Sequence, residues 1–67
     1  MGRQLPTNGQ TIIFSAVPPM SYATPGIRYR VSRGPKDRDF HLTNVATGSS
    51  TYERPAAMAA SSWAEAA

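Results

Sequence analysis

The stretch that decides the fold is IRYRVSRGPKDRDFHL, residues 27 to 42. Apolar and polar side chains alternate on both sides of Gly34 and Pro35, as they do in strands with one buried and one wet face. The Gly-Pro pair interrupts the alternation and supplies a turn. The sequence therefore predicts a β-hairpin with one apolar face, which consists of Ile27, Tyr29, Val31, Phe40 and Leu42.

Basic side chains are concentrated on this hairpin. Five of the seven lysines and arginines of the chain lie in it, namely Arg28, Arg30, Arg33, Lys36 and Arg38. We expect the first two on the polar face of the first strand and the other three at the tip. Asp39 is expected opposite Arg28 or Arg30, where a cross-strand ion pair contributes ~0.2–1 kcal/mol. The hairpin is thus either a surface that binds phosphates or a solvated face with partly neutralised charge.

Residues 11 to 17, TIIFSAV, predict another strand, because they are rich in β-branched and aromatic side chains. Ile12 and Phe14 lie on one face and Ile13 on the other, so both faces are apolar near the centre. We expect such a strand to be covered on both sides or to contact a partner. A second copy of the chain, bound through Ile12, Ile13 and Phe14, is one such partner.

A loop with two large side chains follows this strand. The prolines at 18 and 19 end the strand, and Pro25-Gly26 suits a type II turn. Met20 and Tyr22 lie between these points. The simpler expectation is that both side chains fold back and cap the small core. The alternative is a binding loop with exposed anchors, since methionine and tyrosine are enriched at interfaces.

The C-terminal part of the chain changes character. A further short strand is expected to end near Tyr52, after a turn at Gly48. The alanine-rich segment that follows predicts a helix beginning near Arg54, with Pro55 in its first turn. One stripe of this helix, which we expect to dock on the sheet with Trp63 as its anchor, contains Ala56, Ala59, Ala60, Trp63 and Ala67.

The predicted fold class is α+β, an antiparallel sheet of three to four strands with one C-terminal helix packed across it. Residues 1 to 10 are expected to form a flexible N-terminal tail and residues 11 to 67 a single small β-β-β-β-α domain. The chain has 67 residues and no cysteine, so one small core must hold it together without disulfides. Such a domain is marginally stable, unusually well packed or stabilised by a partner.

The sequence favours a protein without enzymatic activity. His41, the one histidine, is expected on the solvent-facing side of a strand, and no nucleophile elbow, oxyanion-hole signature or phosphate loop accompanies it. We expect no metal and no cofactor, since the usual thiolate ligands of zinc are missing. Neither a signal peptide nor the ~20 apolar residues of a membrane span is found. A cytoplasmic location is expected, in the host cytoplasm if a phage encodes the chain.

From Ile27 to Ala64, the order of three strands and a helix resembles the arm-binding modules of phage integrases and the plant AP2-type domains. The residues that carry this resemblance are Tyr52, Arg54, Pro55, Ala57 and Trp63. The resemblance implies a small nucleic-acid-binding domain whose sheet reads the major groove. In this chain the basic hairpin, residues 28 to 38, would supply the contacts.

In size and composition the whole chain also resembles the short accessory proteins of phages and mobile elements, which include anti-CRISPR inhibitors. Arginine outnumbers lysine six to one and alanine is abundant, as in proteins from GC-rich bacterial genomes and their phages. The resemblance implies an inhibitor or adaptor that occupies a surface of a larger protein or nucleoprotein complex. We rank this function first, nucleic-acid binding second, and a structural subunit of a phage or assembly third. The expected partner-binding residues are Met20, Tyr22, Arg28, Arg30, Arg33, Lys36 and Arg38.

Overall fold

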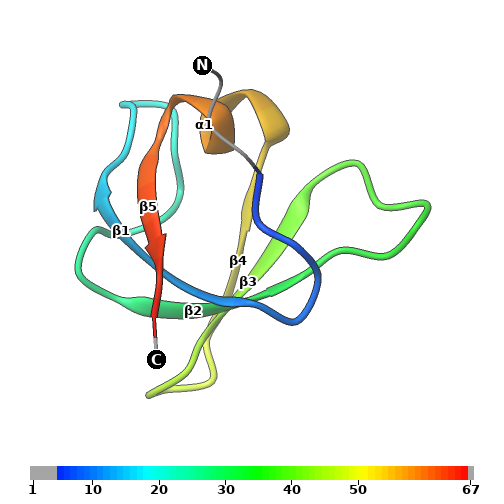
Figure 1. Cartoon of the computed structure of the whole chain (residues 1–67), viewed down its shortest axis with the longest axis horizontal. Helices are drawn as coiled ribbons and strands as arrows, with labels where there is room; N and C mark the ends of the chain where they lie inside the picture. The colour runs from blue at the N-terminus through cyan, green and yellow to red at the C-terminus, as the bar shows by residue number, and fades with distance from the viewer. Residues whose placement is uncertain (1–4, 67) are drawn as a thin grey trace.

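The computed structural model describes residues 5 to 66 and contains one antiparallel sheet and one short helix. The elements are, in chain order, β1 (Thr11–Ala16), β2 (Arg28–Ser32), β3 (Phe40–Asn44), β4 (Ser50–Glu53), α1 (Pro55–Ala60) and β5 (Ser62–Glu65). The strand order in the sheet is β4-β3-β2-β1-β5, so the last strand returns to lie beside the first (Figure 1). The fold is α+β, as predicted, but the sheet has five strands instead of three or four and the helix is small.

The central hairpin forms as predicted. β2 pairs with β3, with Val31 opposite Leu42 and Ser32 opposite His41. Side chains on both strands alternate between exposed and buried positions. The apolar face is confirmed, because four of its side chains are at most 5% exposed and Ile27 is partly buried against them.

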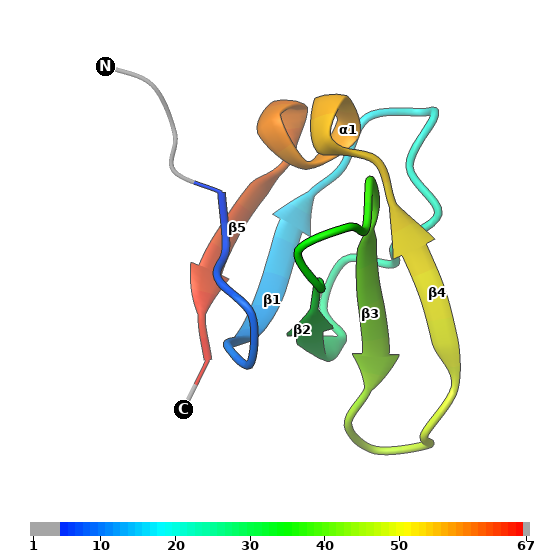
Figure 2. The same ribbon diagram turned by 90° about the vertical axis from the view of Figure 1, so that its right-hand side faces the viewer.

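The core lies on the inner side of the curled sheet. Ile12 and Phe14 of β1 are buried there, and the Phe14 ring meets the Tyr29 ring edge-on with 6.0 Å between the ring centroids. The helix α1 lies across one end of the sheet (Figure 2) and adds the fully buried Met58 to the core. The described part of the chain contains no helix that is long and apolar enough to cross a membrane.

The C-terminal helix is much shorter than predicted. It ends at Ala60, and the next residues form β5, in which Ala64 lies opposite Ile13 and Trp63 opposite Phe14. Ser61 ends the helix because its backbone is extended and its hydroxyl donates to the Ala57 carbonyl at 2.7 Å. A longer isolated helix would have gained little, whereas β5 completes a hydrogen-bonded ladder on the free edge of β1. The predicted helix through Ala67 was therefore wrong, and Ala67 itself lies outside the described residues.

The predicted docking stripe was also wrong. Ala56, Ala59 and Ala60 are exposed, and the helix contacts the core through Ala57 and Met58. Trp63 does pack against the core, but from strand β5, where it stays partly exposed. Its indole nitrogen is buried and has no hydrogen-bond partner among residues 5–66.

The segment before β1 is attached to the sheet. Gly9 donates its backbone N–H to the Val31 carbonyl at 2.7 Å, and Val31 donates to the Gln10 carbonyl at 2.8 Å. The Asn8 side chain accepts the backbone N–H of Arg33 at 3.1 Å, and Pro6 is buried. The ordered domain thus begins before Thr11, and of the expected flexible tail only residues 1 to 4 lie outside the described residues.

The expected dimer contact on β1 does not fit the structure. Both edges of β1 are occupied, by β2 on one side and β5 on the other. Ile12 and Phe14 are 0% and 1% exposed, since they belong to the core of their own chain. Only Ile13 points outward and stays partly accessible. A second copy therefore cannot bind through all three side chains.

Candidate interaction site

The loop between β1 and β2 displays two large apolar side chains. Met20 is 53% exposed and Tyr22 is 60% exposed, whereas the neighbouring Ala23 is buried and Ser21 is partly buried. The expectation that Met20 and Tyr22 cap the core was therefore wrong. Inward and outward side chains alternate along residues 20 to 23, as they would on a strand, so one side of the loop holds it in place and the other is presented to solvent. We call residues 18 to 26 the anchored loop.

A buried carboxylate holds this loop. Glu53 ends β4, lies opposite Phe40 of β3 and is 0% exposed. It accepts a hydrogen bond from the Ser21 hydroxyl and another from the Tyr22 backbone N–H at 3.3 Å. The Ser21 hydroxyl oxygen in turn accepts the Ala23 N–H at 3.0 Å. Because burying a polar group is costly unless it is hydrogen-bonded, the loop and the Glu53 side chain depend on each other.

Two further contacts fix the end of the loop. The Tyr29 hydroxyl accepts the backbone N–H of Thr24 at 3.0 Å. Gly26 donates its N–H to the Phe14 carbonyl at 2.9 Å and has a φ of 87°, which suits the turn predicted at Pro25-Gly26. The backbone is thus tied to β4 at Ser21 and Tyr22 and to β2 and β1 at Thr24 and Gly26.

The basic residues of β2 lie on the outward face of the sheet. Arg28 and Arg30 are exposed, and Arg30 lies opposite Thr43 on β3 and opposite Thr11 on β1. Asp39 does not lie opposite either arginine, because it precedes β3 and the register places it beyond Ser32. The expected ion pair is therefore not formed, and no ion pair within 4.0 Å exists anywhere in residues 5–66.

Arg33 has a structural role at the hairpin tip. Its guanidinium lies 4.4 Å from the centre of the Phe40 ring and donates to the carbonyls of Asp37 and Arg38 at 3.3 and 3.4 Å. The Asp37 carboxylate closes the turn by accepting the Gly34 N–H at 2.8 Å. Arg33 is thus largely committed to the fold.

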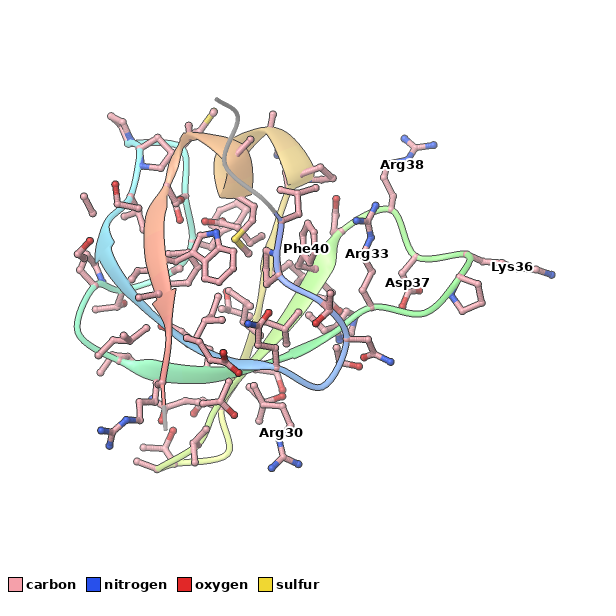
Figure 3. The ribbon with its side chains drawn as sticks, viewed as in Figure 1. Arg30, Arg33, Lys36, Asp37, Arg38 and Phe40 are labelled. Carbon is pink, nitrogen blue, oxygen red and sulfur yellow. The ribbon has the colours of Figure 1, made fainter. Side chains whose placement is uncertain are left out.

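The structure does not bring the five basic residues into one surface. Figure 3 shows Lys36 and Arg38 projecting from the tip in different directions, while Arg30, in the middle of β2, points away from the tip. Apart from Arg33, these basic residues therefore form two groups, Arg28 and Arg30 on β2 and Lys36 and Arg38 at the tip. Neither pair includes Met20 or Tyr22, which belong to the anchored loop.

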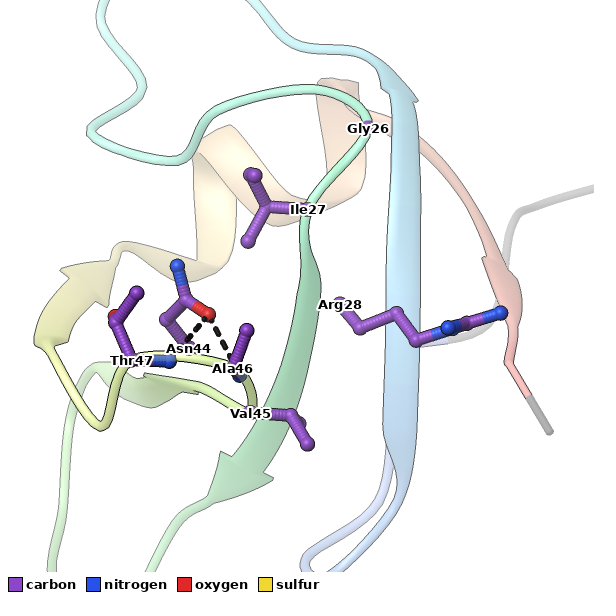
Figure 4. Close-up of a pocket in the computed structure, with 7 residues that line it drawn as sticks. All are labelled: Gly26, Ile27, Arg28, Asn44, Val45, Ala46 and Thr47. Carbon is purple, nitrogen blue, oxygen red and sulfur yellow. Dashed lines mark hydrogen bonds between the residues drawn. The ribbon is translucent and has the colours of Figure 1, made fainter.

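Hollows flank the turn between β3 and β4. Asn44 holds this turn, because its side-chain oxygen accepts the N–H groups of Ala46 and Thr47 at 2.9 and 3.2 Å (Figure 4). A hollow of about 360 Å³ lies beside Ile27 and Ala46. On the outward face, a second hollow of about 420 Å³ is lined by Arg30, Thr43, Asn44, Val45 and Gly48.

His41 and Tyr52 form an exposed aromatic pair on β3 and β4. Their ring centroids are 4.5 Å apart and the rings are nearly perpendicular. A hollow of about 180 Å³ beside them is also lined by Asp37, Arg38 and Asp39. No group of three or more metal-ligating side chains occurs in the part of the chain that the structure describes.

Comparison of the chain with known proteins found no relative. Among the residues that carry the resemblance to integrase arm-binding modules and AP2-type domains, Trp63 was expected on the helix but lies on strand β5, after a helix of six residues. No family model, curated protein or solved structure that we compared with the chain matches it.

Proposed function

We propose that this chain is a non-enzymatic inhibitor or adaptor that occupies a surface of a larger protein or nucleoprotein complex, with the anchored loop as its main contact. The observation that carries the proposal is the exposure of Met20 and Tyr22 on a backbone that Glu53 holds in place. Binding costs less conformational entropy when the contacting segment is already ordered. Tyrosine and methionine are also among the residue types enriched at interfaces.

The charge of the chain defines the kind of partner. The formal net charge is +3, and Arg28 and Arg30 are exposed and form no ion pair within residues 5–66. Such a surface favours an acidic or mixed partner through electrostatic steering and complementarity. Size and composition agree with an accessory protein of a phage or bacterium, anti-CRISPR-like in style and acting in the cytoplasm.

Binding of nucleic acid is the second candidate. The observation in its favour is the exposed aromatic pair, His41 and Tyr52, on the same outward side of the sheet as Arg30, because bases stack on such rings beside basic side chains. Two features count against it. The basic hairpin is divided into two groups, and the carboxylates of Asp37 and Asp39 flank the hollow beside Tyr52.

A capture experiment with matched variants tests the proposal. The tagged protein is exposed to bacterial lysate with and without nuclease, and retained proteins are identified by mass spectrometry. The double variant Met20→Ala, Tyr22→Ala removes the exposed anchors. Tyr52→Ala is the control, because Tyr52 is 52% exposed and Tyr22 60%, and Tyr52 lies outside the anchored loop.

We expect one specific partner to survive nuclease, to be lost by the double variant and to be retained by Tyr52→Ala. Thermal unfolding of all three proteins must show that they are folded. Loss of every partner on nuclease treatment would overturn the proposal. Loss with Tyr52→Ala but not with the double variant would place the contact on the aromatic pair and favour nucleic acid.

A further inference from the structure

The outward face at the start of β2 combines two unpaired arginines with an exposed apolar side chain. Val45 is 55% exposed, and its N–H donates to the Arg28 carbonyl at 3.0 Å, which continues the β2–β3 ladder past Asn44. Figure 4 shows Ile27 and Arg28 extending from β2 in opposite directions, with the Arg28 side chain crossing in front of β1. Arg30 and Val45 both line the hollow of about 420 Å³. We call Arg28, Arg30, Thr43 and Val45 the Val45 patch.

We propose that the Val45 patch binds an extended acidic segment of the partner protein. This inference rests on the proposed function and names the chemistry that the partner presents. Two carboxylates would meet Arg28 and Arg30, and an apolar side chain between or beside them would contact Val45 at the edge of the hollow.

Charge complementarity is the first reason. The chain has four acidic residues, and none of them belongs to the patch. Asp37 and Asp39 lie at the hairpin tip, Glu53 is in the core, and Glu65 is on β5, which β1 separates from β2. Neither arginine forms an ion pair within residues 5–66, so a carboxylate from outside would displace no existing ion pair.

The spacing of the two arginines is the second reason. Arg28 and Arg30 are two residues apart on one strand, and such residues share a face at roughly 7 Å. Alternate residues of an extended peptide have the same spacing and also face one side. Acidic residues at alternate positions of a partner segment can therefore reach both guanidinium groups, and each arginine can bind a carboxylate with two parallel hydrogen bonds.

The apolar part of the patch distinguishes a peptide from a nucleic acid. Val45 would stay exposed if phosphates alone were bound, and the patch itself contains no aromatic ring on which a base could stack. A peptide supplies both the carboxylates and an apolar side chain. The observations therefore favour an acidic protein segment.

Peptide titration followed by NMR tests this inference on the whole chain. One synthetic peptide has glutamates at alternate positions with valine and serine between them. A second peptide has the same composition with the glutamates grouped at one end, and an oligothymidylate provides a phosphate probe. We expect the alternating peptide to bind more tightly than the grouped one and to shift the amide signals of the Val45 patch.

Matched charge variants provide the control. Arg28→Gln with Arg30→Gln should weaken binding of the alternating peptide about tenfold or more, because two charge-assisted pairs are lost. Lys36→Gln with Arg38→Gln removes the same charge at the tip and should change the affinity less than about twofold. Val45→Ser should weaken the peptide but leave the oligothymidylate unaffected.

Three results would overturn the inference. The first is that both charge variants lose affinity for the alternating peptide equally. The second is that the protein binds the alternating and the grouped peptide equally well, and the third is that oligothymidylate binds the Val45 patch more tightly than the alternating peptide does. The outcome is separable from that of the proposed function. If capture of the partner still depends on Met20 and Tyr22 but is unchanged by the Arg28 and Arg30 variant, the function stands and the Val45 patch is not part of its contact.

Discussion

A hydrogen bond between Ser21 and Glu53 joins the anchored loop to the end of β4. The Ser21 hydroxyl donates to the Glu53 carboxylate, although 32 residues separate the two in the sequence. Glu53 is fully buried, and its second oxygen accepts the Tyr22 N–H. The hydrogen bonds that satisfy the buried Glu53 side chain therefore also determine where Met20 and Tyr22 are displayed.

Replacing Ser21 with alanine should destabilise the protein and loosen the loop. The change leaves a buried carboxylate without one donor, which lowers the free energy of unfolding by ~1–3 kcal/mol. Urea unfolding measures this loss. Hydrogen exchange should show faster exchange of the Tyr22 amide, because its acceptor is no longer held in place.

Ser15→Ala is the matched control. The Ser15 hydroxyl also makes one hydrogen bond, to the Ser62 carbonyl at 3.3 Å, but at an exposed position. We expect a change within about 0.5 kcal/mol. If Ser21→Ala were as stable as Ser15→Ala, the Glu53 carboxylate would not require the loop, and another cause would be needed for the loop's position.

Arg33→Ala should disorder the hairpin tip while leaving the sheet intact. It removes a cation–π contact with Phe40, worth ~0.5–1 kcal/mol at such a site, and two hydrogen bonds to the tip backbone. Lys36→Ala loses the same charge and no contact of this kind. Faster hydrogen exchange at Asp37 in the Arg33 variant alone is the expected result. Equal exchange in both variants would show that Arg33 does not organise the tip.

The parts of the fold that follow local periodicity could be predicted. The β2–β3 hairpin alternates strictly, so its strands, turn and apolar face were readable from residues 27 to 42 alone. Glu53 was missed because a glutamate at a strand end is normally exposed. On β4 the inward positions are Thr51 and Glu53, with Tyr52 outward, so a rule that places apolar side chains inside would have turned Glu53 toward solvent. Its partner Ser21 lies in a distant loop, so no local pattern predicts the pair.

The C-terminal region was mispredicted because a distant strand decides its structure. Alanine, methionine and glutamate favour a helix locally, and the sequence offers no β-branched residue after Thr51. The free edge of β1, about fifty residues earlier, nevertheless pairs with Ser62–Glu65. The sequence also predicted one surface from five basic residues of the hairpin. The structure separates them, because side chains on the strand and at the tip leave the backbone in different directions.

The buried side of α1 can be tested with two alanines. Ala57 is 1% exposed and Ala59 is exposed. Ala57→Leu should overpack the core and cost ~1–3 kcal/mol, whereas Ala59→Leu should stay within ~0.5 kcal/mol of the original protein. Urea unfolding compares the two. The reverse order would support the stripe predicted from the sequence, in which Ala59 faces the sheet.

The direction in which one substitution changes the free energy of unfolding distinguishes a strand from a helix after Ala60. Ala64 is exposed on β5 and lies opposite Ile13 of β1. Valine suits a strand better than alanine and would pack beside Ile13, so Ala64→Val should raise the free energy of unfolding by ~0.2–1 kcal/mol. In a helix the same change would lower it, because valine is a poorer helix former than alanine. Ala59→Val, on the exposed side of α1, supplies that comparison and should lower stability by up to about 0.7 kcal/mol. Opposite signs at the two positions in urea unfolding are expected, and a loss of stability at both would mean that residues 62 to 65 continue the helix.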